Sequence, residues 1–142
     1  MLKLRIKRDN IVFYIVFNYT GVDMSFLLGI DIGSTTAKAV LLKNGTVVYE
    51  KYARHFSKVR EKCCELIEEL CPLTGDNDIS VAISGSAGLG LAESAGIAFI
   101  QEVFATGEVV KQLEADTSCV IELGGEDAKI IFFDGGVDER MN

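Results

Sequence analysis

Two segments of the chain, 91 positions apart, follow the same pattern of residues. Segment 30–38 reads Ile-Asp-Ile-Gly-Ser-Thr-Thr-Ala-Lys, and segment 121–129 reads Ile-Glu-Leu-Gly-Gly-Glu-Asp-Ala-Lys. Each continues through four apolar residues to a turn, which is Asn-Gly at 44–45 and Gly-Gly at 135–136. Apolar runs joined by a short turn of glycine and polar residues are typical of β-hairpins. The repeat therefore predicts two related hairpins, each with an acidic residue near the end of its first strand.

The order of the apolar and polar runs predicts the fold class. Pro72 is expected to end the first helix, because proline lacks the amide hydrogen that continues a helix. Three antiparallel strands followed by alternating helix and strand predict an α/β fold: a ribonuclease-H-like lobe with a mixed sheet, plus the first hairpin of a second equivalent lobe. We expect strands at 26–32, 36–42, 46–53, 79–84 and 119–123, helices at 57–70, 91–95 and 102–114, and an extended segment at 97–100.

This order divides the chain into three parts. We interpret 1–23 as an N-terminal extension outside the fold, with Met24 as the natural start, because Met24 directly precedes the first predicted strand. The apolar run at 11–17 is too short to cross a membrane, which takes about 20 residues. Residues 24–117 form the first predicted lobe and 118–142 the truncated start of the second.

Composition excludes several classes of function. A net charge of −7 argues against binding to nucleic acid by electrostatic attraction, and a hydrophobic content of 49% is sufficient for a folded core. The four cysteines contain no Cys-x-x-Cys pair. Three of them fall in the first predicted helix, where Val59, Cys63, Ile67 and Leu70 form one apolar stripe. We therefore expect core thiols in a reducing compartment, which favours the cytoplasm.

The turn of the first hairpin has the composition of a phosphate-binding loop. Successive backbone amides in a tight turn can converge on a phosphate, and a glycine allows it to approach closely. Asp31 stands at the carboxyl end of a buried strand, where it can hold Mg²⁺ directly or through water. The alternative is an ordinary hairpin turn with an incidental acid, which the second copy makes less attractive. The phosphate contacts are assigned to Gly33, Ser34, Thr35 and Thr36.

The second turn is expected to contact the same phosphates from the opposite side, through Gly124, Gly125, Glu126 and Asp127. Glu122 corresponds to Asp31 in the repeat and is assigned a role in assisting the metal or positioning a water. Asp127 is the alternative for that role. Either acid could instead be a solvated turn residue.

Other polar residues near the two turns leave alternatives open. Lys38 and Lys129 occupy equivalent strand positions, where each could contact a phosphate or extend to solvent. Gln101 and Glu102 open a predicted helix and could orient an attacking water, or Glu102 could interact with the helix dipole.

Two further features are given ordinary structural roles. Segment 85–90, Gly-Ser-Ala-Gly-Leu-Gly, lacks the spacing of a dinucleotide fingerprint and is interpreted as a close-packed turn beside the nucleotide cleft. His55, the single histidine, is expected at the end of an edge strand facing solvent. A catalytic triad or a zinc hydrolase is therefore disfavoured.

Together these residues resemble a known superfamily, that of actin, the sugar kinases and the heat-shock-chaperone ATPases. Within it, segments 29–38, 85–90, 101–103 and 121–129 are similar to motifs of the activators of 2-hydroxyacyl-CoA dehydratases and the ATPase subunits of benzoyl-CoA reductase. The last residues, 139–142, look like the lead-in to that family's Cys-Ala-Ala-Gly-Thr-Gly segment. The resemblance covers about 26–142.

The resemblance implies an ATP-hydrolysing activase that passes a low-potential electron to a 2-hydroxyacyl-CoA dehydratase or a related reductase. It implies ATP and Mg²⁺ as ligands, with Asp31, Glu102 and Glu122 in catalytic roles and Lys38 on the phosphates. Such activators are homodimers with a bridging four-iron, four-sulfur (4Fe-4S) cluster. The family's cluster cysteine follows the position of Asn142, so no ligand for it is present in this chain. No nucleic-acid or membrane partner is implied.

Two alternatives from other classes remain. A small-molecule kinase for an amino sugar would need a catalytic carboxylate after the fourth strand, where this chain has Ser-Gly-Ser at 84–86. A nucleotide-sensing module related to actin needs no catalysis. The 142-residue chain alone is expected to be inactive as an ATPase, because its second lobe is incomplete.

Overall fold

A computed structural model describes residues 26–114, 116–124, 128–133 and 138–141. The first sheet has the strand order β3-β2-β1-β4-β5 and the second has the order β6-β7-β8. β1 pairs with β2 antiparallel and with β4 parallel, so the first sheet is mixed and the expected α/β fold class is confirmed. In chain order the elements are β1 (Phe26–Ile32), β2 (Thr36–Lys43), β3 (Thr46–Arg54), α1 (Val59–Thr74), β4 (Ile79–Ser84), α2 (Leu89–Ala95), β5 (Ala98–Phe99), α3 (Glu102–Leu113), β6 (Cys119–Leu123), β7 (Ala128–Phe132) and β8 (Asp138–Met141).

β1 is the central strand, and all seven of its residues are buried. Its even-numbered residues pack with α1 and α2 in the main core. Because side chains alternate across a strand, its odd-numbered residues face the other side of the sheet. Burial of each large aliphatic side chain stabilises the fold by about 1.5–3 kcal/mol. The continuous apolar run at 26–32 thus gives a strand that is covered on both faces.

Helix α1 packs on the sheet through Cys63, Leu66, Leu70 and Thr74, all of them buried. The predicted stripe was wrong at Ile67, whose side chain is 42% exposed. Leu66 and Ile67 are adjacent and equally apolar, so only packing against the sheet determines which of them faces inward. Of the three cysteines on this helix, only Cys63 is a core thiol, because Cys64 and Cys71 are exposed.

Pro72 does not end α1, as the sequence predicted, because the helix continues to Thr74. Pro72 lies in the last turn of the helix, where few residues follow it and the loss of its amide hydrogen bond has little effect on the rest of α1. The following turn is closed by the N–H of Gly75, which donates to the carbonyl of Cys71 at 3.0 Å. The hydroxyl of Thr74 also donates to the carbonyl of Leu70, at 3.4 Å. Buried Thr74 keeps the end of the helix against the sheet.

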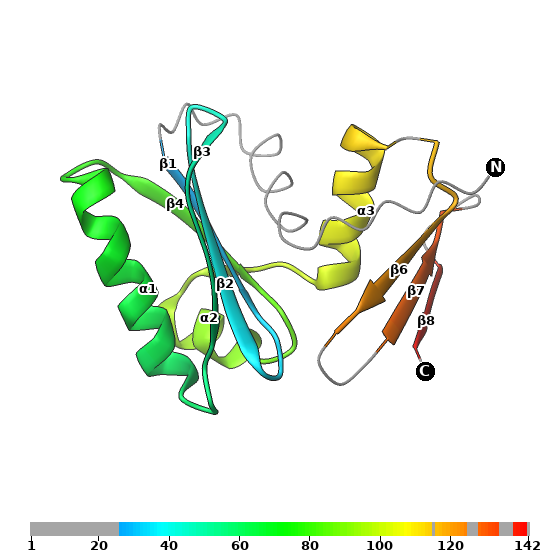
Figure 1. The fold of residues 1–142 in the computed structure, drawn as a ribbon, viewed down its shortest axis with the longest axis horizontal. Coiled ribbons are helices and arrows are strands. Elements are labelled where there is room, and N and C mark those ends of the chain that lie inside the picture. Colours follow the sequence, from blue (N-terminus) through cyan, green and yellow to red (C-terminus); the bar gives the residue numbers. More distant parts are fainter. Residues whose placement is uncertain (1–25, 115, 125–127, 134–137, 142) are drawn as a thin grey trace.

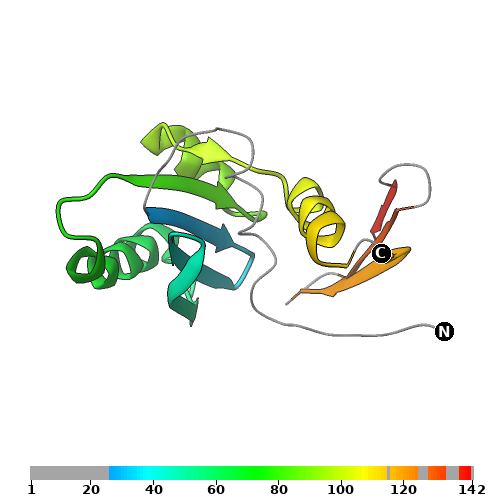
Figure 2. The same cartoon turned by 90° about the horizontal axis from the view of Figure 1, so that it is seen from above.

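Helix α3 lies between the two sheets, on the opposite side of the first sheet from α1 (Figure 1). The view from above gives the same arrangement (Figure 2). Its buried face consists of Ala105, Thr106 and Val109. Val103 and Val110 of the same helix are half-buried. Ala105 and Val109 form a small separate core with Ile100.

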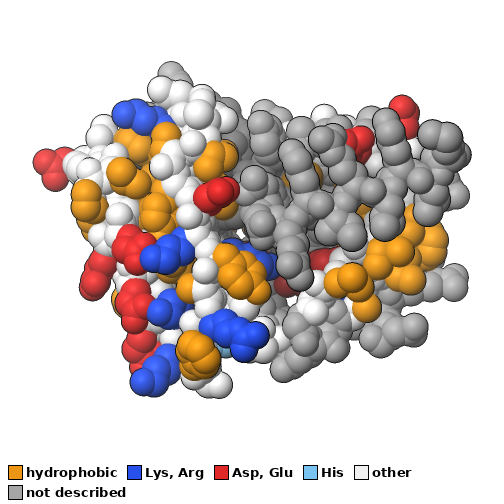
Figure 3. Space-filling view, viewed as in Figure 1, with side chains coloured by type: hydrophobic (Ala, Val, Ile, Leu, Met, Phe, Trp, Pro, Cys, Tyr) orange, Lys and Arg blue, Asp and Glu red, His pale blue; other side chains and the backbone are white. Residues whose placement is uncertain are grey.

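The outer surfaces carry ordinary solvated charges and some exposed apolar side chains. Acidic and basic side chains are interspersed over α1 and β3 (Figure 3), where the ion pairs Lys51–Glu69 and Lys62–Glu65 form. On the second sheet, Ile121 and Leu123 are 54% and 73% exposed. Within the described residues, no helix has the length and apolar character needed to span a membrane.

Some sequence predictions lie outside the described residues. They concern the extension at 1–23 with its start at Met24, and the turn at 135–136. Strand β8 adds a third strand, antiparallel to β7, to the hairpin that the repeat predicted.

Gly85 lets the turn after β4 pack directly against the end of β1. It has a φ of 93°, and a Cβ there would lie 2.2 Å from the carbonyl oxygen of Ile32. That same carbonyl accepts the N–H of Ala87 at 2.9 Å. The close-packed turn predicted at 85–90 is thus built around a position that only glycine fits.

We expect Gly85→Ala to lower the free energy of unfolding by about 3 kcal/mol or more, because the new methyl group clashes with backbone at a positive φ. The matched control is Gly90→Ala in α2, where an added Cβ meets nothing within 4 Å. That change should be neutral or stabilising by up to about 1 kcal/mol. Urea denaturation of the two variants and the wild type measures both effects. Equal stability of the two variants would contradict this account of the turn.

Candidate functional site

The carboxylate of Asp31 is held by side chains from both neighbouring strands. In the sheet register Asp31 lies opposite Lys38 of β2 and beside Ser84 of β4. The ammonium of Lys38 donates to Oδ2 at 2.7 Å, and the hydroxyl of Ser84 donates to Oδ1 at 3.1 Å. Asp31 is 4% exposed and Ser84 is fully buried. The strand pairing therefore fixes an anionic centre on the face of the sheet opposite α1.

The second hairpin repeats the acid and the lysine but connects them differently. Glu122 lies opposite Lys129 in the register of β6 and β7, as Asp31 lies opposite Lys38. Lys129 forms an ion pair with Glu102 of α3. The acid and the lysine therefore occupy matching register positions in both hairpins, as the repeat predicted. Only the lysine of the second hairpin is paired with an acid from α3.

The carboxyl group of Glu122 is unusual because one of its buried oxygens lacks a hydrogen-bond partner among the described residues. Among the described residues its Oε2 is the one buried side-chain oxygen or nitrogen with no hydrogen-bond partner. Burial raises the pKa of Glu122, and the charges of Glu102 and Asp31 raise it further, against the opposing effect of Lys129 and Lys38. A buried carboxylate oxygen with no partner is unfavourable, so it favours a bound cation, water or proton at this position.

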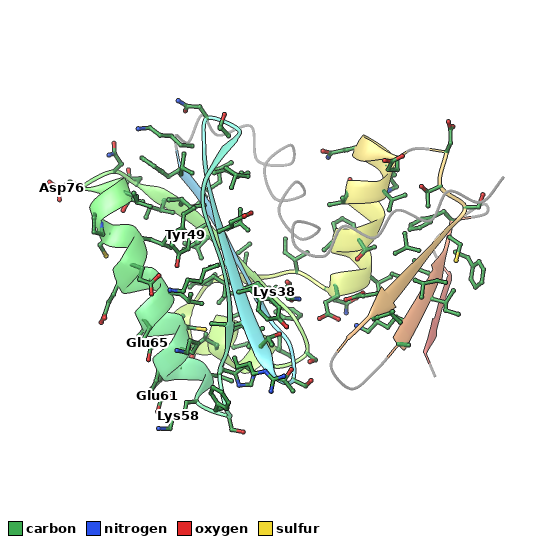
Figure 4. The ribbon with its side chains drawn as sticks, viewed as in Figure 1. Lys38, Tyr49, Lys58, Glu61, Glu65 and Asp76 are labelled. Atoms are coloured by element: carbon green, nitrogen blue, oxygen red, sulfur yellow. The ribbon has the colours of Figure 1, made fainter. Side chains whose placement is uncertain are left out.

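Asp31 and Glu122 belong to different sheets and interact electrostatically. The charge of Asp31 acts on Glu122, and the charge of Glu122 acts on Lys38. Burial by itself lowers the pKa of Lys38, but its ion pair with Asp31 and the charge of Glu122 outweigh burial and raise it. Lys38 lies on the side of the first sheet that faces α3, whereas Tyr49, Glu61 and Glu65 lie on the side of α1 (Figure 4).

The turn between β1 and β2 is closed and leaves amides available. The N–H of Gly33 donates to the carbonyl of Thr36 at 2.9 Å. Ser34 and Thr35 are exposed, and among the described residues no hydrogen bond uses their backbone N–H groups. Thr36 is buried at the start of β2. Free amides at an exposed turn beside Asp31 are a suitable surface for a phosphate.

His55 is not at the surface, as the sequence predicted, but 4% exposed beneath this turn. Its Nε2 lies 3.0 Å from the carbonyl oxygen of Gly33, and its Nδ1 accepts the N–H of Ser57 at 3.1 Å. The backbone N–H of His55 donates to the carbonyl of Thr35 at 3.2 Å. The register explains the location, because Thr36 pairs with Arg54 and the next residue therefore reaches the turn. Counting the hairpin register in the sequence could have found it.

The remaining sequence-predicted residues divide into described and undescribed ones. Gly124 is exposed directly after β6, whereas Gly125, Glu126 and Asp127 lie outside the described residues. Glu102, in the first turn of α3, is committed to Lys129. Gln101 precedes α3, is exposed, and makes no side-chain cap. Ser84, which sequence reasoning gave no binding role, joins the site through the parallel register of β1 and β4.

The residues of this region fit a hydrated magnesium ion. Mg²⁺ in nucleotide sites binds one or two carboxylates and completes its shell with waters and phosphate oxygens. Asp31 and the unpartnered oxygen of Glu122 supply that number of carboxylates. Within the described part of the chain no three histidine, cysteine or acidic side chains gather as a metal site. The arrangement therefore suits a metal that arrives with a phosphate ligand rather than a site built from protein groups alone.

The pKa of Glu122 generates a test of the charge arrangement. A carboxyl group whose pKa is raised in the folded state stabilises the fold at a pH below its unfolded-state pKa. That stabilisation is lost as the pH rises through the folded-state pKa. We therefore expect Glu122→Gln to gain stability relative to the wild type as pH rises from about 4. Urea denaturation across pH 3.5–8 measures the difference, with Glu50→Gln on exposed β3 as control. A difference that does not change with pH would contradict the raised pKa.

The fold is similar to those of several solved structures. No protein-family model matches the chain, and no curated protein matches it. Among solved structures it is similar to (R)-2-hydroxyglutaryl-CoA dehydratase component A from Acidaminococcus fermentans, with a TM-score of 0.64 and 25% identity over 82% of this chain and 47% of that chain. It is also similar to ethanolamine utilization protein EutJ from Carboxydothermus hydrogenoformans, with a TM-score of 0.60 and 16% identity over 85% of this chain and 53% of that chain.

A ROK family transcriptional regulator matches with a TM-score of 0.52 and 15% identity, over 80% of this chain and 38% of that one. The chain spans about half the length of the first two structures, 47% and 53%. These neighbours belong to the actin-like ATPase superfamily, and the chain has the mixed α/β fold of that superfamily.

Proposed function

We propose that this chain is the ATP-binding N-terminal part of an activator. In this proposal the complete protein is a cytoplasmic homodimer that couples ATP hydrolysis to low-potential electron transfer. Its partner is a 2-hydroxyacyl-CoA dehydratase or a related reductase. The nucleotide's terminal phosphates bind between the turn at 33–35 and the end of β6 in the second hairpin.

The arrangement around Asp31 is the observation that carries the proposal. A buried carboxylate is oriented by Lys38 and Ser84, and it stands directly before a turn whose exposed amides are available. Glu122, with an unpartnered oxygen, faces the same region from the second sheet. An anion-binding turn flanked by two carboxylates suits a ligand that is both a phosphate and a carrier of Mg²⁺.

Each residue has a defined part in this proposal. Asp31 and Glu122 would hold the hydrated Mg²⁺, whose charge would stabilise the negative charge that develops on the phosphates. Lys38 is oriented by Asp31 and supplies a positive charge beside it. The amides of Ser34 and Thr35 donate to phosphate oxygens. Catalysis of this kind depends on positioning and charge stabilisation, without a covalent intermediate.

The activator role has one further support, the likeness to dehydratase component A at 25% identity. The proposal assigns none of the cysteines of this chain to the redox centre. Cys63, Cys64 and Cys71 lie on α1 and Cys119 on β6, and all four are free. Burial and the neighbouring Cys64 raise the pKa of Cys63 to about 11, which keeps that thiol protonated. In this proposal, which follows the resemblance to the activators, the ligand of the iron–sulfur cluster lies in a part of the complete protein outside these 142 residues.

We expect Asp31→Asn to weaken Mg²⁺–ATP binding about tenfold or more, because it removes the charge that holds the metal and orients Lys38. Isothermal titration calorimetry with Mg²⁺–ATP measures the dissociation constant. The control is Asp76→Asn, because Asp76 is exposed in the loop after α1, at the far end of that helix from Glu61 (Figure 4). Circular dichroism establishes that both variants remain folded. Unchanged affinity in folded Asp31→Asn would remove Asp31 from the site.

The activator role needs a separate measurement on the complete protein that contains this chain. We expect ATP, but not a non-hydrolysable analogue, to support electron transfer from that protein to a purified 2-hydroxyacyl-CoA dehydratase. The dehydration of the acyl-CoA substrate is the readout. If ATP is hydrolysed but the dehydratase stays inactive with every acyl-CoA tested, a kinase or nucleotide-sensing role replaces the activator.

A further inference from the structure

The side chain of His55 makes hydrogen bonds through both ring nitrogens, and this fixes its tautomer. Nδ1 accepts the backbone N–H of Ser57 at 3.1 Å, so the proton of the neutral ring resides on Nε2. Nε2 lies 3.0 Å from the carbonyl oxygen of Gly33, to which it therefore donates. His55 thus fixes the direction of the Gly33 carbonyl.

A fixed carbonyl also fixes the next amide. In a trans peptide the C=O of one residue and the N–H of the following residue point in opposite directions. Because the Gly33 carbonyl points toward buried His55, the N–H of Ser34 points away from it, on the side where Ser34 is exposed. The backbone N–H of His55 also holds the carbonyl of Thr35. Two carbonyls that would repel a phosphate are therefore engaged beneath the turn.

The backbone directly after His55 is strained. Phe56 and Ser57, directly after it, have φ values of 48° and 62°, which non-glycine residues adopt only at an energetic cost. This turn delivers the N–H of Ser57 to Nδ1, and the N–H of Lys58 to the carbonyl of His55 at 2.7 Å. The side chain of Phe56 is 77% exposed, so its packing does not account for the turn.

We propose that His55 is a positioning residue that orients the Gly33–Ser34 peptide, so that the Ser34 N–H is directed at a bound phosphate. It touches no ligand itself and acts through the backbone of the turn. The inference rests on the proposed binding of a nucleoside triphosphate at this turn. It adds to that proposal a histidine from the end of β3 that organises the site.

Three substitutions separate the hydrogen bonds of His55 from its volume. Glutamine can place an amide N–H near the position of Nε2, whereas asparagine reaches only the position of Nδ1 and phenylalanine keeps the ring without either bond. We expect His55→Phe and His55→Asn to weaken Mg²⁺–ATP binding about tenfold, and His55→Gln to remain within about threefold of the wild type. Calorimetric titration gives the dissociation constants, and the thermal midpoint of each variant reports its folding.

The comparison of glutamine with asparagine carries the test if His55→Phe does not fold. Equal affinities for these two variants, or wild-type affinity in folded His55→Phe, overturn the inference while leaving the nucleotide site in place. Failure of the wild type to bind Mg²⁺–ATP overturns the proposed function itself, and the inference with it. A spectroscopic readout is independent of the ligand. The ¹⁵N signals of the imidazole must show the proton on Nε2, and a proton on Nδ1 instead contradicts the inference.

Discussion

The ion pair between Asp31 and Lys38, with Ser84 as the third member, is the interaction on which the rest of the site depends. It exists because β1 is the central strand and is paired on both sides, so that residues from β2 and β4 fall directly beside Asp31. A carboxylate this buried would be strongly unfavourable without such partners. With them, the carboxyl group is held in a fixed orientation near the end of β1, next to an exposed turn. The core packing of β1 against α1 and α2 holds that strand in place.

The two copies of the hairpin are similar in sequence but not in electrostatic state. In the first copy both carboxylate oxygens of Asp31 have partners, whereas in the second Oε2 of Glu122 has none among the described residues. Glu102 from α3 pairs with Lys129 and leaves an excess of acidic groups in this region. The carboxyl groups are those of Asp31, Glu102 and Glu122, and the ammonium groups are those of Lys38 and Lys129. Because a triphosphate adds further negative charge, the proposed binding of a triphosphate at this site requires a divalent cation. The protein's own net charge of −7 reinforces that requirement.

Hydrophobic periodicity and turn residues were sufficient to predict the strands of the first sheet, because a buried central strand leaves an unbroken apolar run. The repeat likewise predicted that an acid and a lysine would occur at equivalent positions in both hairpins. The predictions that were wrong concerned features that depend on packing. Neighbouring Leu66 and Ile67 cannot be distinguished by pattern, and Pro72 lies in the last turn, where the loss of one hydrogen bond is tolerated. His55 was assigned to solvent because a single polar residue after an edge strand carries no signal of burial. Its location follows from the hairpin register and from an unusual turn.

The central claim is that the turn after β1 and the end of β6 contact one metal-bound triphosphate. Paramagnetic line broadening by Mn²⁺–ATP in the ¹⁵N-labelled chain tests it most directly, because the metal ion broadens only amide signals near it. The account predicts selective broadening of the amides of Ser34 and Thr35 together with those of Leu123 and Gly124, while the exposed amides at the end of α1 stay sharp. Broadening confined to one hairpin, or to neither, would contradict it.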